Sequence, residues 1–192
     1  SGYCRQNSPN IILPNDVVSI VVVLSRPSDQ WHTEHKGEHL IIGGINGDTI
    51  TCTADGYQSA YGTNEVELET HLWTLKIVKF VLHPLGERAW IRLAIGVLDT
   101  ALDTPLHRVF SYGKYEWFCF SGYDPLDLKP PHLGGSDINY GAVCKEGDII
   151  GVKLNMKYGS LSYSVNGIDQ GIAFGIRGLT KRLLVTKSYV PP

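Results

Sequence analysis

Glycine and proline recur so often along this chain that long helices have little room to form. The sequence holds 21 Gly and 10 Pro in 192 residues, spaced every few positions. The apolar stretches between them are short and rich in Val, Ile, Leu and aromatic residues, which favours β-strands. Many short strands separated by turn signals are typical of a sandwich or a barrel. The sequence therefore predicts an all-β fold, and its length fits one domain.

Nine segments have the composition expected of strands, and two Asn-Gly steps lie where hairpins should turn. Asn46-Gly47 and Asn166-Gly167 each join two apolar segments, and both residue types tolerate the positive φ that a type I′ turn requires. The second step leads into a further short strand, Ile172–Phe174. Repeated Pro and Gly between Asp124 and Asn139 predict a long loop. The nine predicted strands are Val17–Ser25, His39–Ile42, Thr49–Thr53, His71–Leu82, Trp90–Leu98, Glu116–Ser121, Ile149–Asn155, Ser160–Val165 and Leu183–Ser188.

Charge and hydropathy argue against nucleic-acid and membrane partners. The 17 Lys and Arg against 19 Asp and Glu leave a net charge of −2 at pH 7, so no basic field attracts phosphates or anionic lipids. The longest apolar run, Val17 to Leu24, is about eight residues, whereas a membrane span needs about twenty. The start, Ser1-Gly2-Tyr3-Cys4, does not have the pattern of a signal peptide and resembles a remnant of cloning.

The cysteines predict free thiols rather than a metal site or a disulfide framework. Cys4, Cys52, Cys119 and Cys144 lie far apart and form no C-x-x-C pair. Zinc sites need closely spaced ligands, and disulfide-rich secreted domains are denser in cysteine. We therefore expect a reducing, intracellular compartment, either cytoplasm or nucleus.

One stretch has the turn and strand signals of a β-meander. Gly147-Asp148 predicts a turn, and Ile149–Asn155 a strand with one buried face. Tyr158-Gly159 predicts a hairpin, Ser160–Val165 alternates between small polar and large side chains, and Asn166-Gly167 predicts the next hairpin. Three antiparallel strands should follow one another here.

This meander also resembles the central signature of SPRY domains. That signature runs Gly-Asp, an Ile-Gly-Val strand, a Gly, a Leu-x-Tyr/Phe strand, Asn-Gly, and Gly-x-Ala-Phe. Four more segments are similar to family strands, in order and at family-like spacing: His71-Leu72-Trp73, Ile95-Gly96-Val97, Glu116-Trp117 and Leu183-Leu184-Val185-Thr186. Asn155, Thr74 and Leu183 replace the usual Asp, Glu and Pro, so the resemblance is to a divergent member.

The resemblance implies a two-sheet antiparallel sandwich of the concanavalin-like shape. We expect a single domain over 1–192. The resemblance covers its core, about 17–189, and residues 1–16 would be an N-terminal extension or remnant. SPRY domains recognise short peptides or protein surfaces through edge loops, without catalysis. The implied function is therefore non-catalytic protein recognition by a monomeric module that needs no cofactor or metal. Because ubiquitin-ligase subunits often carry such domains, substrate recognition for a ligase is one expectation.

A branch of the family, the SOCS-box SPRY proteins, suggests where a partner would bind. Its peptide-contacting loop falls on Ile50 to Ala54, but its Arg and Pro are Ile50 and Cys52 here, so a different peptide is expected. We expect the segments Thr51–Gln58, Asp99–Tyr112 and Lys187–Tyr189 to converge at one edge. The predicted binding residues are Thr51, Cys52, Thr53, Ala54, Asp55, Tyr57, Asp99, Tyr112, Lys187, Ser188 and Tyr189.

A run of alternating glutamates offers a different function. Glu65, Glu67 and Glu69 would share one face of a strand, as in laminarinase-like glycosidases, which have the same sandwich shape. Retaining glycosidases need two carboxylates about 5–5.5 Å apart. The alternative is thus a carbohydrate-active sandwich, a glycosidase or a lectin. A solvated acidic face is the simpler interpretation, and a purely structural domain that packs on its parent chain is a third.

Two further expectations concern single residues. His32, His35 and His39 would share a side only on a helix, and Gly37 and Pro27 disfavour one, so a polar loop is predicted rather than a metal or pH-sensing cluster. Trp73 should be nearly fully buried in the middle of its strand.

Overall fold

The computed structural model describes residues 20–24, 30–52, 58–63, 69–80, 90–99, 116–122, 130–134, 138–175 and 181–190. These residues form strands and turns, and they include no helix long and apolar enough to cross a membrane. The strands are β1 (Ile20–Leu24), β2 (Trp31–Lys36), β3 (Leu40–Gly43), β4 (Thr49–Cys52), β5 (Gln58–Gly62), β6 (Thr70–Phe80), β7 (Trp90–Asp99), β8 (Glu116–Gly122), β9 (His132–Leu133), β10 (Ile149–Asn155), β11 (Ser160–Val165), β12 (Ile168–Gly175) and β13 (Lys181–Val190).

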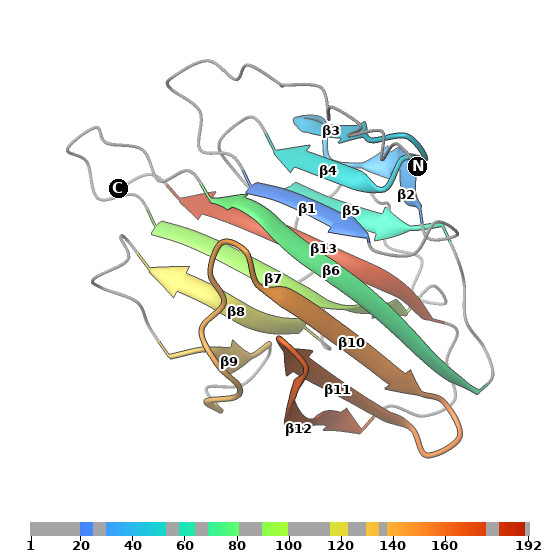
Figure 1. Ribbon diagram of the computed structural model, residues 1–192, viewed down its shortest axis with the longest axis vertical. Helices are drawn as coiled ribbons and strands as arrows, with labels where there is room; N and C mark the ends of the chain where they lie inside the picture. The colour runs from blue at the N-terminus through green and yellow to red at the C-terminus, as the bar shows by residue number, and fades with distance from the viewer. Residues whose placement is uncertain are drawn as a thin grey trace, which may run out of the picture.

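The strands form two antiparallel sheets that lie one over the other (Figure 1). The seven-stranded sheet has the order β12-β11-β10-β6-β1-β4-β3, and the six-stranded sheet has the order β2-β5-β13-β7-β8-β9. The predicted all-β sandwich is confirmed. The meander β10–β11–β12 ends the seven-stranded sheet, and Ile149–Asn155 and Ser160–Val165 have the predicted bounds.

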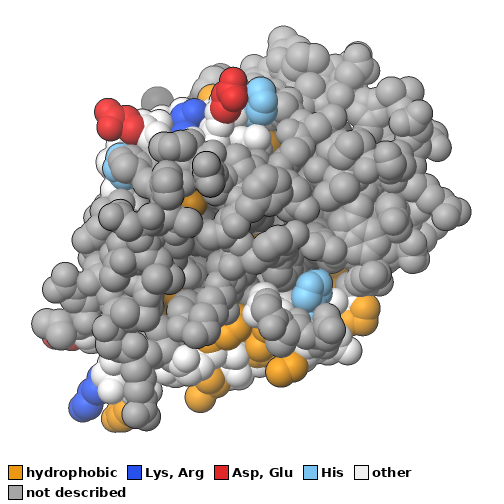
Figure 2. All heavy atoms as spheres, turned by 180° about the vertical axis from the view of Figure 1, so that it is seen from behind, with side chains coloured by type: hydrophobic (Ala, Val, Ile, Leu, Met, Phe, Trp, Pro, Cys, Tyr) orange, Lys and Arg blue, Asp and Glu red, His pale blue; other side chains and the backbone are white. Residues whose placement is uncertain are grey.

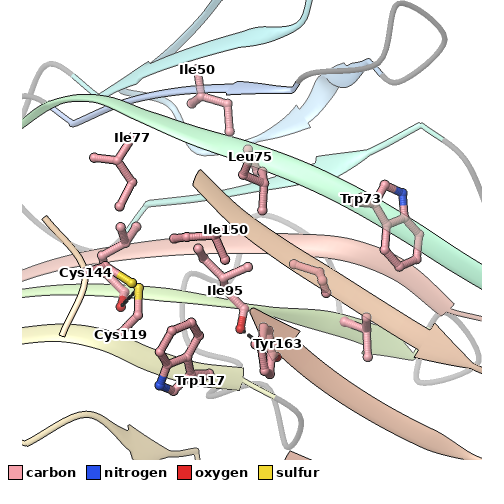
Figure 3. Close-up of a cluster of buried hydrophobic side chains, with 14 of the residues drawn as sticks. Ile50, Trp73, Leu75, Ile77, Ile95, Trp117, Cys119, Cys144, Ile150 and Tyr163 are labelled. Atoms are coloured by element: carbon pink, nitrogen blue, oxygen red, sulfur yellow. Dashed lines mark hydrogen bonds between the residues drawn. The ribbon is translucent and has the colours of Figure 1, made fainter. Parts of the chain in front are cut away.

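The core lies between the sheets and follows from alternation along each strand. Trp73, Leu75 and Ile77 of β6 point inward, and Ile150 and Leu154 of β10 lie beside them. Trp73 is 5% exposed, so its predicted burial is confirmed. Figure 3 shows Leu75 and Ile150 between the sheets, on the side of Ile95, Trp117 and Tyr163, and all of these residues belong to one buried cluster. Burying each large aliphatic side chain contributes about 1.5–3 kcal/mol.

Three strands were not predicted: β2, β5 and β9. β2 reads Trp-His-Thr-Glu-His-Lys, with one large apolar residue, and only Trp31 and Lys36 are in register with β5. Trp31 holds this strand in place, because its side chain is buried and Nε1 donates to the Asp48 carbonyl at 2.9 Å. The polar loop predicted at His32 to His39 is therefore wrong at His32 and His35, which lie on β2, while His39 lies in the turn that follows.

The two Asn-Gly steps have different conformations. Asn166 (φ 51°) and Gly167 (φ 80°) both have positive φ, as a type I′ turn requires, so this hairpin is confirmed. Between β3 and β4, Gly44 and Gly47 take positive φ and Asn46 does not. The hairpin predicted here is confirmed, since β3 and β4 pair antiparallel, but the type I′ turn at Asn46-Gly47 is wrong, because residues 44–48 form a longer connection.

Candidate interaction surface

Two turns at one end of the sandwich are joined through their side chains. Asp148 is buried, and its carboxylate accepts hydrogen bonds from the Lys145 amide (2.8 Å) and from Nδ2 of Asn166 (2.9 Å). The other side-chain atom of Asn166, Oδ1, accepts from the Ile149 amide at 2.9 Å. The Gly-Asp and Asn-Gly motifs of the meander therefore fix each other, and they give this end a rigid frame on which loops can vary.

The predicted binding segments reach this end in part. Figure 1 shows β4 and β13 ending, and β5 beginning, at the same end of the sandwich. The strand register pairs Lys187 with Gln58, so the segments that contain these two residues meet. Thr53, Ala54, Asp55, Tyr57 and Tyr112 lie outside the described residues.

Asp99 does not lie at this end. Along the pair β7–β13, Asp99 is opposite Lys181 and Ile91 is opposite Tyr189, eight positions away. At about 3.3 Å per residue, the separation is about 26 Å. The predicted convergence of Asp99 with Lys187–Tyr189 is therefore wrong, because β7 ends where its antiparallel partner begins. Whether Lys187, Ser188 and Tyr189 contact a partner stays a prediction.

Thr51 and Cys52 are each 2% exposed. Cys52 points into the core between the sheets, as Ile50 does, whereas Thr51 lies on the other face of β4. Thr51 and Cys52 are the last two residues of β4, and both side chains are buried. Thr51 and Cys52 therefore offer a partner little side-chain surface.

Sequence reasoning missed Gln58, which organises this end. Its side chain is buried, and Oε1 accepts a hydrogen bond from the His39 amide at 3.2 Å. The turn between β2 and β3 is thereby tied to β5, and the Gly37 amide adds a bond to the Ser59 carbonyl at 2.9 Å. A side chain at Gly37 would collide with Gln58 Oε1. No sequence motif marks this glutamine.

The glutamate run begins outside the described residues, which include Glu69 but neither Glu65 nor Glu67. Glu69 is exposed and has a φ of 71°, which is a bend rather than an extended strand. Its carbonyl accepts from the Met156 amide at 2.8 Å, so its backbone closes the end of β6 against the β10–β11 hairpin. Glu69 was expected to lie on one face of a strand, but it lies in the bend before β6 and is not part of a strand.

The described side chains form neither a metal site nor a reactive thiol. No three or more of their His, Cys, Asp and Glu side chains are grouped to hold a metal ion. The thiols of Cys119 and Cys144 are not joined in a disulfide, are fully buried and lie side by side (Figure 3). A hydrogen bond with the Cys119 side chain, together with burial, raises the pKa of Cys144. Such a thiol stays protonated and is a poor nucleophile.

Comparisons with solved structures identify the fold. The SPRY domain of human HERC1 superposes with a TM-score of 0.56 and 16% identity, over 84% of this chain and 97% of that domain. The NHR domain of Neuralized from Drosophila melanogaster is similar with a TM-score of 0.47 and 13% identity, over 85% of this chain and 91% of that domain. No family model matches this sequence, and no curated protein is significantly similar to it. The chain is a divergent SPRY-like domain in its fold.

Proposed function

We propose that this domain is a non-catalytic protein-recognition module that binds a short segment or a surface of a partner protein. The observation that carries the proposal is the SPRY fold, which matches nearly the full length of the HERC1 domain. The family signatures support it, since the meander motifs stand in their family order and join through Asp148 and Asn166. An intracellular setting and a role in a ubiquitin ligase are part of this proposal.

The partner would bind at the end where β4 and β13 finish. The pairing of Lys187 with Gln58 supports this position, because two segments far apart in sequence meet there. The proposed anchors are Tyr57 and Tyr189, since tyrosine adds contact area and a hydroxyl at little entropic cost. The buried side chain of Cys52 would support the loop from within.

The experiment is capture by the purified domain, followed by mass spectrometry of the retained proteins. Tyr189→Ala should weaken capture by about tenfold or more, the usual effect of losing a central anchor. Tyr158→Ala is the matched control, because Tyr158 is exposed in the β10–β11 hairpin at the opposite end. Equal capture by both variants would contradict the proposed position, and binding or hydrolysis of glycans would favour the carbohydrate alternative.

A further inference from the structure

The outer face of the seven-stranded sheet carries exposed aliphatic side chains over β6, β10 and β12. Leu72 is 44% exposed, Ile149 is 45% exposed and Ile172 is 72% exposed. Each lies on the side of its strand away from the core: Leu72 and Ile149 alternate with the buried Trp73 and Ile150, and Ile172 pairs with Ser162, which lies between the buried Leu161 and Tyr163. The solvent face of an antiparallel sheet is usually polar. Exposed aliphatic side chains that together form an apolar patch on such a face mark interaction sites.

Lysines lie directly opposite two of these aliphatic side chains, Ile149 and Leu72. Lys76 is the cross-strand partner of Ile149, and Lys153 is the cross-strand partner of Leu72. Lys79 is a third exposed lysine near the end of β6. Among the described residues that face outward from β6, β10, β11 and β12, the one acid is Asp169, which accepts a hydrogen bond from the Gly171 amide at 2.8 Å. The face is therefore basic as well as partly apolar.

The centre of this face carries only small side chains. Gly151 lies between the two lysine–aliphatic pairs, opposite Thr74 on β6 and Ser164 on β11. A Cβ at this position would collide with Oγ of Ser164. A glycine inside a strand often marks a place where a ligand or another backbone approaches closely. The lysines and aliphatics thus border a centre where Ser164 covers Gly151 and where Thr74 lies opposite.

Strand addition at β12 is a less suitable way to bind, because side chains already occupy backbone groups of this edge. The Gly171 carbonyl accepts from the Tyr140 hydroxyl at 2.7 Å, and the Ile168 carbonyl accepts from Nε2 of Gln170 at 2.8 Å. On the opposite side of the molecule, exposed apolar side chains gather along the lower edge (Figure 2). The aliphatic face is therefore available through its side chains rather than through its backbone.

We propose that this lysine–aliphatic face, defined by Leu72, Lys76, Ile149, Lys153 and Ile172, docks an acidic segment of a partner that carries aliphatic or aromatic side chains. The charge of the face selects acidic residues, and the aliphatics select apolar ones. From Leu72 to Lys76 and from β6 to β12 the face measures about 13 Å by 14 Å. The area of this face is well below the roughly 800 Å² that each partner buries in a standard interface. The face therefore fits a segment rather than a whole domain. It is a different surface from the loop end proposed above.

The test is a titration of the isotope-labelled domain with synthetic peptides, followed by amide chemical shifts. One peptide of about twelve residues alternates Glu with Leu and Phe, and its twin has Lys in place of every Glu. The acidic peptide should shift the amides of β6, β10 and β12, and the basic twin should not. Raising NaCl from about 0.05 M to about 0.5 M should weaken the binding, because the screening length shortens.

Charge-reversal variants distinguish binding at this face from a general effect of the net charge of the domain. Lys76→Glu with Lys153→Glu should weaken binding of the acidic peptide by about tenfold. Lys157→Glu is the control, since Lys157 is exposed in the β10–β11 hairpin, outside the face. Equal weakening by the control, equal binding of the basic peptide, or no shift on the face at millimolar acidic peptide would each overturn the proposal. Self-association of the domain through this face would also overturn it.

Discussion

The two faces of the β6–β10 strand pair differ in what their side chains do, although the same seven residue pairs supply both. On the inner face, Trp73 and Ile150 are buried against the six-stranded sheet. On the outer face, Leu72 and Ile149 are each nearly half exposed. Neighbouring residues of one strand therefore differ completely in their contribution to stability. The comparison shows that apolar character alone does not identify the core of this sheet, because both faces have it.

The largest expected effect is the loss of a core aromatic. Trp73→Ala should lower the free energy of unfolding by about 3–5 kcal/mol, since it removes a large buried ring and leaves a cavity. The adjacent Leu72→Ala should change it by about 0.5 kcal/mol or less, because Leu72 lies on the exposed face. Urea unfolding followed by circular dichroism measures both. Similar losses in the two variants would mean that the faces of β6 are assigned wrongly.

A smaller effect is expected where the two meander turns join. Asp148→Ala should cost about 1–3 kcal/mol, because the Lys145 amide and the Asn166 side chain lose their acceptor. Asn166→Ala should cost a comparable amount, and the double variant should lose less than the two single losses combined. A double-mutant cycle in urea measures this coupling. Strictly additive losses would show that the two turns do not stabilise each other.

The smallest expected effect concerns Tyr140 and depends on pH. Burial raises the pKa of Tyr140 from 10.0 to about 12, and its hydroxyl donates to the Gly171 carbonyl. Because the unfolded chain releases this proton at lower pH than the folded protein, this contribution to stability is complete below pH 10 and is lost between pH 10 and about 12. Tyr140→Phe should lose about 0.5–1 kcal/mol at neutral pH.

The check for Tyr140 is the difference in unfolding free energy between wild type and Tyr140→Phe, followed from pH 8 to 12. That difference should shrink as the pH rises through the interval between 10.0 and about 12. A constant difference over the whole range would contradict the assigned role of the Tyr140 hydroxyl.

Local signals in the sequence were enough to predict most strands and the whole meander. Ser160–Val165 alternates strictly, Ile149–Asn155 has the length and composition of a strand, and glycine turns follow both, so pattern and turn chemistry agree. β2 and β5 were missed because their residues are mostly polar or small, and tertiary contacts such as those of Trp31 hold them in place. Local pattern contains no information about such distant partners.

The candidate sites were harder to predict because they depend on register. The sequence singled out segments 51–58 and 187–189, but the pairing of Lys187 with Gln58 and the distance of Asp99 follow only from how β13 pairs with its neighbours. The lysine–aliphatic face likewise depends on strand register. Lys76 and Ile149 lie 73 positions apart in sequence, and only the antiparallel register makes them neighbours.

The most direct test of this account compares two adjacent residues, Ile149 and Ile150, each changed to Ser. Ile150→Ser should lower the free energy of unfolding by about 2–5 kcal/mol, because Ile150 is fully buried. Ile149→Ser should leave stability within about 0.5 kcal/mol of wild type and should weaken binding of the acidic peptide several-fold. Unchanged binding by a folded Ile149→Ser domain, or equal destabilisation by both variants, would contradict the assignment of a stabilising inner face and a recognising outer face.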